Sequence, residues 1–236
     1  PANTIFQLDG ETITTFRQPS GNANGLGTDG DGLLLAAEHG NRRVSRTTAD
    51  GSVVSVADSY EGMRLNSPND VAVADDGTIY FSDPPYGISG GQQELSFNGV
   101  FRVSPAGDLT AEWEGARSSR PNGLVLSLDA SWLYVADTAS GAVQAHQVGA
   151  DGALGDPQAF ATTQGSPDGM ALDGHGNLYV TTAAGVEVFD PAGQRWGTIA
   201  FPEQPANCGF GGADRTVLYV TARTGLYRVQ MVVPGR

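Results

Sequence analysis

A tandem repeat is the feature that most constrains the fold of this chain. An interval of about 40 to 50 residues separates successive copies of one pattern, and each copy begins with a polar pair. After the pair come a short alternating segment, a turn rich in Gly and Asp, and an apolar run such as "WLYVAD" or "NLYVTT". The pairs are Asn24-Gly25, Asn69-Asp70, Asn122-Gly123, Asp168-Gly169 and Asn207-Cys208. A repeat of this length predicts that the fold is built from copies of one supersecondary unit.

The content of each copy favours β-strands. Segments rich in β-branched and aromatic residues alternate with polar positions, and no helical period of 3.6 residues persists. The chain holds 33 glycines, which suits a fold with many tight hairpins. Four antiparallel strands per copy predict an all-β β-propeller with almost no helix, and a parallel β-helix or stacked sandwiches are the alternatives.

Composition excludes several classes of partner. The net charge of −13 disfavours nucleic acid, because phosphate binding needs a basic surface. Cys208 is the single cysteine, so no internal disulfide can form, and we expect it to be a small buried hydrophobe. No apolar stretch reaches the ~20 residues that cross a bilayer. We therefore expect a soluble protein, cytoplasmic or periplasmic, that is a monomer or a dimer and binds neither nucleic acid nor membranes.

The polar pairs predict a common site. If each pair begins the innermost strand of a blade, the first residues of all the pairs converge on one mouth of the propeller. The second strand runs back toward that mouth, so its end should add Glu38, His39, Asp83, Tyr86 and Asp137. Asn-Gly and Asp-Gly also form hairpin turns. Asn122 and Asp168, however, follow polar loops rather than strands, which favours the mouth.

Oxygen ligands at this mouth would suit a hard divalent cation. Asn and Asp oxygens are the donors that Ca²⁺ and Mg²⁺ prefer. The histidines His39, His146 and His175 are scattered along the sequence and show no zinc-binding spacing. The sequence therefore favours Ca²⁺, with Mg²⁺, Mn²⁺ and Zn²⁺ as alternatives.

Four motifs carry a resemblance to a known family. They are "AEHGNRRVSR", "LNSPNDVAVADDGTIYFSDPPYG", "RPNGL" and "SPDGMALD". Together they closely resemble the gluconolactonase, senescence marker protein (regucalcin) and luciferin-regenerating enzyme family. The resemblance implies a six-bladed propeller that hydrolyses lactones, or phosphotriesters in some relatives, with one divalent metal at the mouth.

The resemblance also implies roles for single residues. Asn122 of "RPNG" and Asp168 of "SPDGM" match metal ligands of the family, and Asn69 of "SPND" matches an asparagine that touches the metal, or its bound water and the substrate. The family's remaining ligand is a glutamate in an N-terminal "EGP" motif, which this sequence does not contain. Ser67 stands where a relative with a sugar-lactone preference has arginine, which weakens the case for aldonolactones.

The same resemblance sets the expected domain organisation. Residues 1–236 are predicted to form a single propeller domain, with a partial first blade over residues 1–20 and blades two to six from about residue 21. The first blade would lack its N-terminal strands, and the last would have three strands without the closing one.

The expected chemistry is metal-dependent opening of a lactone ring. Asp168 is the preferred base as well as a ligand, with Glu38 or His39 in reserve. Glu38 could instead form an ion pair with Arg42 or Arg43. Asn69, Asn24 and Tyr86 are candidate contacts to a small-molecule lactone, with Tyr86 in a long glycine-rich loop over residues 83–97.

Two other functions remain open at this stage. The same site could hydrolyse phosphotriesters, or the propeller could be a non-catalytic binding module whose metal only stabilises the fold. A binding module would more often expose an aromatic patch. Trp113, Trp132 and Trp196 instead fall within strand patterns, so we expect them in the core between blades.

Overall fold

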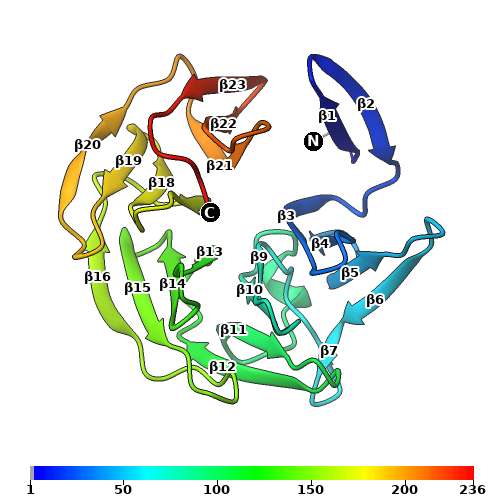
Figure 1. The fold of residues 1–236 in the computed structure, drawn as a ribbon. Coiled ribbons are helices and arrows are strands. Elements are labelled where there is room, and N and C mark those ends of the chain that lie inside the picture. The colour runs from blue at the N-terminus through cyan, green and yellow to red at the C-terminus, as the bar shows by residue number, and fades with distance from the viewer. Residues whose placement is uncertain (1–2) are drawn as a thin grey trace. The chain divides into compact units, whose positions relative to one another are not determined.

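The computed structural model describes residues 3–236, and these form two compact units that divide between Arg117 and Ser118. Both units consist of antiparallel sheets (Figure 1). In the described residues the only helical element is the 3₁₀ turn η1 (Gly90–Gln92), which confirms the expected near-absence of helix. No helix from residue 3 onward has the length and apolar character needed to cross a lipid bilayer.

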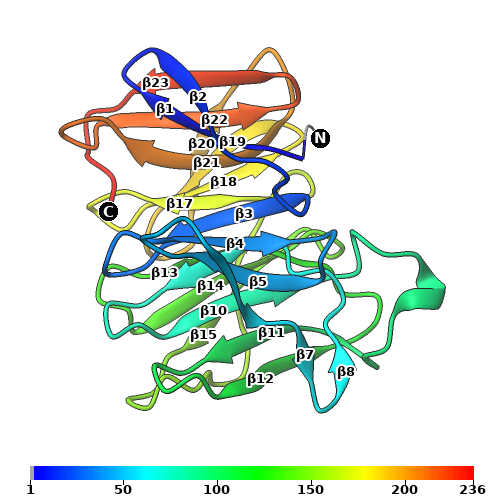
Figure 2. The same ribbon diagram turned by 90° about the vertical axis from the view of Figure 1, so that its right-hand side faces the viewer.

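The first unit contains two four-stranded sheets and two hairpins. One sheet is β3 (Ala23–Thr28), β4 (Leu34–Glu38), β5 (Arg43–Thr47) and β6 (Val53–Ala57), and the other is β9 (Val71–Val73), β10 (Ile79–Asp83), β11 (Asn98–Val103) and β12 (Leu109–Gly115). The hairpins are β1 (Ile5–Asp9) with β2 (Thr12–Arg17), and β7 (Ser59–Tyr60) with β8 (Met63–Arg64). The loop that carries η1 extends beyond the strand ends of this unit (Figure 2).

The second unit contains two four-stranded sheets and one three-stranded sheet. The strands of the first two are β13 (Pro121–Leu126), β14 (Trp132–Asp137), β15 (Ala142–Gln147), β16 (Gln158–Thr162), and β17 (Met170–Leu172), β18 (Leu178–Thr182), β19 (Gly185–Phe189), β20 (Arg195–Ile199). The third is β21 (Pro205–Gly211), β22 (Val217–Ala222) and β23 (Gly225–Gln230). In every sheet consecutive strands are neighbours, which is the antiparallel meander of a propeller blade.

The prediction of an all-β propeller type holds, but the prediction of six blades is wrong. The described residues form five sheets of blade size, one for each polar pair in the sequence, and β1–β2 remains a two-stranded sheet. The sixth blade was implied by the family resemblance and not by a sixth copy of the repeat. Two strands offer one ladder of hydrogen bonds and too little apolar face to make a blade.

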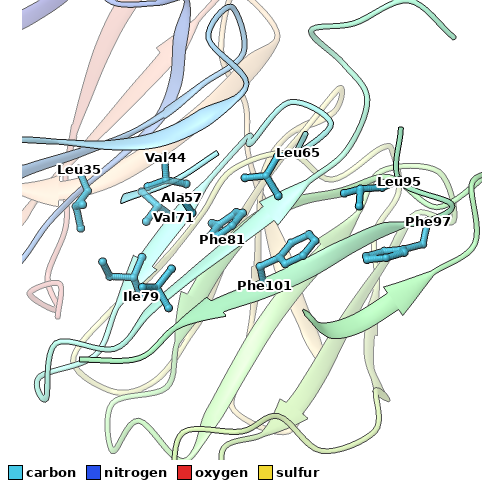
Figure 3. Packing of buried hydrophobic residues seen from close by; sticks show 11 residues of the cluster. Leu35, Val44, Ala57, Leu65, Val71, Ile79, Phe81, Leu95, Phe97 and Phe101 are labelled. Atoms are coloured by element: carbon cyan, nitrogen blue, oxygen red, sulfur yellow. The ribbon is translucent and has the colours of Figure 1, made fainter. Parts of the chain in front are cut away.

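Apolar side chains between adjacent sheets form the core of each unit. In the first unit Phe101 stacks on Phe81, with 5.2 Å between ring centroids, and on Phe97 at 5.7 Å (Figure 3). In the second unit one cluster joins the β13–β16 and β17–β20 sheets, and another joins β17–β20 to β21–β23. The expectation that all three tryptophans lie in the core is wrong for Trp196, which is 65% exposed on the edge strand β20.

The polar pairs lie at the start of the first strand of each sheet, as predicted. In β3, β13 and β21 the register with the next strand shifts at the pair, between Ala23 and Leu26 in β3 and between Pro121 and Leu124 in β13. In the other two sheets the pair comes directly before β9 and β17. A local break in the ladder redirects side chains away from the ordinary alternation. The pairs thus lie where the regular ladder is interrupted or has not yet begun.

Candidate active site

In the three pairs that contain glycine, this residue brings the first strands of neighbouring sheets into direct contact. The Gly123 amide donates to the carbonyl oxygen of Asp168 at 3.0 Å, and the Gly169 amide donates to Ala206 O at 2.9 Å. A Cβ at Gly123 would lie 2.3 Å from Asp168 O, and one at Gly169 would lie 2.0 Å from Asn207 Oδ1. Only glycine allows this approach. Gly25 makes the same contact in the first unit, where its amide donates to Asn69 O at 2.7 Å.

In the second unit this contact places Asn122 beside Asp168. The Asn122 side chain is buried and hydrogen-bonds the Asp168 carboxylate. Asn122 Nδ2 also donates to Thr138 Oγ1 at 2.9 Å, and Thr138 Oγ1 donates to Pro167 O at 2.7 Å. Thr138 therefore holds both the Asn122 amide and the segment that leads into Asp168.

Asp168 carries a carboxylate in a poorly solvated position. Burial raises its pKa to about 6, against an opposing effect of the hydrogen bond with Asn122. Such a carboxyl group exchanges a proton close to neutral pH, whereas an ordinary aspartate does not. Asp168 therefore has the electrostatic character of a general base or of a ligand whose charge a cation would neutralise.

In the first unit Asn24, Asn69 and His39 form a second cluster. Asn69 Oδ1 accepts a hydrogen bond from Asn24 Nδ2 and lies 3.0 Å from His39 Nε2. Burial lowers the pKa of His39, while its hydrogen bond with Asn69 acts in the opposite direction. Asn69 is buried, His39 is half-buried and Asn24 is exposed, so the cluster reaches from the interior to the surface.

Glu38, the other candidate base, forms ion pairs with arginine side chains. Its carboxylate accepts from Arg43 Nε at 2.8 Å and Arg17 Nη2 at 2.9 Å, and also from Asn41 and Ser45. Burial raises the pKa of Glu38, but the hydrogen bonds from Arg43, Ser45 and Asn41 outweigh it, and the net shift is downward. The predicted alternative, an ion pair with Arg43, is therefore what forms. Arg42 instead pairs with Glu94.

Two aspartates at the ends of second strands, Asp83 and Asp137, accept hydrogen bonds from backbone amides in the loop before a polar pair. Asp83 Oδ2 accepts from the Asn66 amide at 2.7 Å, and Asp137 Oδ1 accepts from the Arg120 amide at 2.8 Å. Burial raises the pKa of Asp83 to about 7, against hydrogen bonds from the Asn66 and Ser67 amides and the charge of Arg42. These two carboxylates accept hydrogen bonds from the backbone, and the sequence did not predict this role.

The loop after β10 lies against the His39 cluster. A Cβ at Gly87 would lie 2.6 Å from His39 Cβ, so the backbone at residue 87 is in contact with this side chain. The preceding residue, Tyr86, is 42% exposed. Its predicted contact with substrate stays a prediction.

Comparison with known proteins agrees with the resemblance found in the sequence. Residues 2–224 match the SMP-30/Gluconolactonase/LRE-like region family. The chain belongs to this family.

Two relatives and one solved structure give the degree of similarity. The gluconolactonase of Zymomonas mobilis is 37% identical, over 91% of this chain and 64% of the relative. Regucalcin of Xenopus laevis is 29% identical, over 81% of this chain and 65% of the relative. The structure of a Xanthomonas campestris gluconolactonase is 35% identical with a TM-score of 0.85, and covers 96% of this chain and 76% of that one. The chain thus spans a little under two thirds of these first two relatives.

The donor atoms of the site fit a hard cation better than a soft one. Asp168 offers a carboxylate and Asn122 an amide, and the poorly solvated charge of Asp168 would be stabilised by a bound cation. Among residues 3–236 no group of three or more His, Cys, Asp and Glu side chains is placed to hold a metal ion. The amide oxygen of Asn122 could add to the carboxylate of Asp168 as a neutral ligand. Asn69 Oδ1 already accepts from Asn24 and contacts His39, and its role as a ligand stays a prediction.

Sequence reasoning missed the supporting roles of several residues, although it named Ser67, Gly123 and Gly169 for other reasons. Thr138, Gly123, Gly169 and Ser67 act through hydrogen bonds or through the absence of a side chain, and no chemistry-bearing pattern marks them. One usable signal existed, since glycine follows the polar residue in three of the pairs. That recurrence could have indicated a close approach of backbones.

Proposed function

We propose that this family member hydrolyses a lactone, with Asp168 as the group that takes the proton of the attacking water. The observation that carries the proposal is the half-buried Asp168 carboxylate, hydrogen-bonded by Asn122, whose pKa is raised to about 6. The names of the relatives support the substrate class, because the Zymomonas mobilis and Xanthomonas campestris proteins are both called gluconolactonases.

In this proposal Asp168 of the second unit accepts the proton of the attacking water. A water molecule next to Asp168 attacks the carbonyl carbon of the lactone as its proton passes to a carboxylate oxygen. The ring C–O bond then breaks, and the proton held by Asp168 passes to the departing ring oxygen, which becomes the hydroxyl group of the hydroxy-acid product. A pKa near 6 gives Asp168 a stronger affinity for this proton than an ordinary aspartate has, yet leaves it ionised at pH 7 to 8. Asn122 and Thr138 keep the carboxylate oriented through the contacts described above.

We further propose that the reaction depends on a divalent cation, with Ca²⁺ favoured over Mg²⁺, Mn²⁺ and Zn²⁺. Asp168 and Asn122 of the second unit would hold it, and the role of Asn69 as a ligand stays a prediction from the family resemblance. When bound, the cation would supply polarisation of the lactone carbonyl. A carboxylate that binds a cation loses basicity, and His39 is the reserve base that the sequence predicted. Its low pKa keeps the imidazole neutral near pH 7.

The test is hydrolysis of a panel of small lactones followed with a pH indicator. The protein is stripped of metal and then supplied with Ca²⁺, Mg²⁺, Mn²⁺ or Zn²⁺. We expect metal-dependent turnover that Asp168→Asn lowers at least about 100-fold. Asp75→Asn removes an exposed carboxylate and should leave turnover unchanged.

Two results would overturn the proposal. Full activity of the folded Asp168→Asn variant would exclude Asp168 as the base, and undiminished activity after chelation would exclude the cation. Turnover of phosphotriesters without turnover of lactones would identify the alternative substrate class.

A further inference from the structure

We propose that Ser67 is a positioning residue for His39 and acts through the backbone of Gly87. The inference rests on the proposed function only where it predicts a change in turnover. The structural part concerns the ring of His39 and can be tested without any substrate.

Ser67 joins two loops through both hydrogen-bonding capacities of its hydroxyl. Its side chain is completely buried. Ser67 Oγ donates to Pro84 O at 2.7 Å and accepts from the Gly87 amide at 2.7 Å. The hydroxyl therefore fixes the start of the loop after β10 against the segment that leads to Asn69.

The backbone of Gly87 in turn limits where His39 can lie. A Cβ at Gly87 would lie 2.6 Å from His39 Cβ and 3.1 Å from Ser67 Cβ, so residue 87 packs between the two side chains with no space for a methyl group. If the Ser67 hydroxyl is removed, Gly87 loses the acceptor of its amide and His39 loses a fixed neighbour.

Asn69 fixes the Nε2 atom of the His39 ring, which lies far from the Cβ atom that contacts Gly87. A carbonyl oxygen can only accept, so the 3.0 Å contact with Asn69 Oδ1 requires that His39 Nε2 carries the proton. In the neutral ring Nδ1 is then the acceptor. The contact with Gly87 and the hydrogen bond to Asn69 together determine the tautomer and the direction of Nδ1.

Hydrogen bonds to buried side chains fix the backbone around Ser67. Asp83 accepts from the backbone amides of Asn66 and Ser67, and Arg42 Nε donates to Leu65 O at 2.7 Å and to Asn66 O at 3.1 Å. Both of these charged side chains are buried. Both the backbone amides and the backbone carbonyls of the segment before Asn69 are therefore hydrogen-bonded to buried side chains. These contacts fix the position of the Ser67 hydroxyl.

The experiment combines nitrogen NMR with kinetics on the full chain. In protein labelled with ¹⁵N-histidine, we expect His39 to show a single tautomer with the proton on Nε2. In Ser67→Ala, and independently in Gly87→Ala, we expect the His39 resonances to shift toward a mixture of tautomers. His39→Gln identifies the His39 signals. If lactone turnover is confirmed, kcat should fall about 10- to 100-fold with KM changed less than threefold.

Thr47→Val is the matched control, because it removes a buried, hydrogen-bonded hydroxyl. Thr47 is the last residue of β5, whereas His39 lies before the first residue of that strand. The Thr47→Val variant should leave the His39 resonances and kcat unchanged. Unchanged His39 resonances in both Ser67→Ala and Gly87→Ala would overturn the positioning role, whatever the turnover. Absence of lactone turnover in the wild type, with the expected shifts present, would instead contradict the proposed function alone.

Discussion

At the scale of single residues, three buried carboxylates differ because of the groups that surround them. Glu38 contacts two guanidinium groups, and its pKa is lowered. Asp83 contacts backbone amides in a fully buried position, and its pKa rises to about 7. Asp168 has one amide partner and partial access to solvent, and its pKa rises to about 6. Of the three, Asp168 alone combines a raised pKa with exposure, which a general base needs.

Asp83 should make the stability of the protein depend on pH. Its pKa of about 7 in the folded state exceeds the value of about 3.9 in an unfolded chain. Between these values the folded state binds more protons, so the free energy of unfolding falls as pH rises from about 4 to 7 and then levels off. Asp83→Asn keeps an acceptor for the Asn66 amide and removes this dependence.

Urea denaturation at pH 4.5 and pH 8 measures the effect. The wild type should lose up to about 3 kcal/mol of unfolding free energy between pH 4.5 and pH 8 that the Asp83→Asn variant does not lose. An equal change with pH in both proteins would show that Asp83 does not titrate in this range.

At the scale of elements, the glycines of the polar pairs set how closely β13, β17 and β21 approach. In Gly123→Ala the new methyl carbon would lie 2.3 Å from the backbone oxygen of Asp168, and no side-chain rotation can separate the two atoms because the backbone fixes the position of Cβ. We expect a loss of about 1–3 kcal/mol in the free energy of unfolding and lower turnover, because Asp168 moves with its strand. Gly197→Ala, where no atom lies within 4 Å of the added Cβ, should change neither. Equal stability of the two variants in urea would contradict this account of the junction.

The aromatic cluster of the first unit should dominate the stability of that unit. Phe101 is fully buried and contacts the rings of Phe81, Phe97 and Tyr60. Phe101→Ala leaves a cavity among residues of two sheets, and we expect a loss of about 3–5 kcal/mol. Thermal unfolding followed by circular dichroism measures it. Trp196→Ala, at an exposed position, is the control, and a smaller loss for Phe101 than for Trp196 would exclude this core as a source of stability.

The elements themselves could be predicted well from the sequence. Alternation and turn residues gave the strands of the sheets, because strand formation depends mainly on local pattern and on turn chemistry. The exposure of Trp196 could not be predicted in this way. A strand pattern does not say which strand is the edge of a sheet, and β20 has a neighbour on one side only.

At the scale of the whole molecule, the net charge of −13 should weaken the folded state at low ionic strength. Salt screens this repulsion, so the free energy of unfolding should rise when NaCl is increased from 10 mM to 200 mM. CaCl₂ at the same ionic strength should stabilise the protein further, if the proposed cation binds the folded state. Equal stability in NaCl and CaCl₂ would contradict specific binding, and a fall with NaCl would show that attractive ion pairs outweigh the repulsion.

The sequence by itself determined the all-β repeat, the place of each polar pair at the start of a sheet and the family, because these follow from local pattern and from motifs. Only the tertiary structure decided what each acidic side chain does. Glu38, Asp83 and Asp168 look alike in the sequence, yet one pairs with arginines, one holds backbone amides and one remains open to solvent. The same holds for Gly123, Ser67 and Thr138, whose importance comes from atoms of distant segments. A carboxyl group takes its charge and pKa from its neighbours in the folded chain, and the partners that distinguish these three groups include distant ones: Arg17 for Glu38, Asn66 for Asp83 and Asn122 for Asp168.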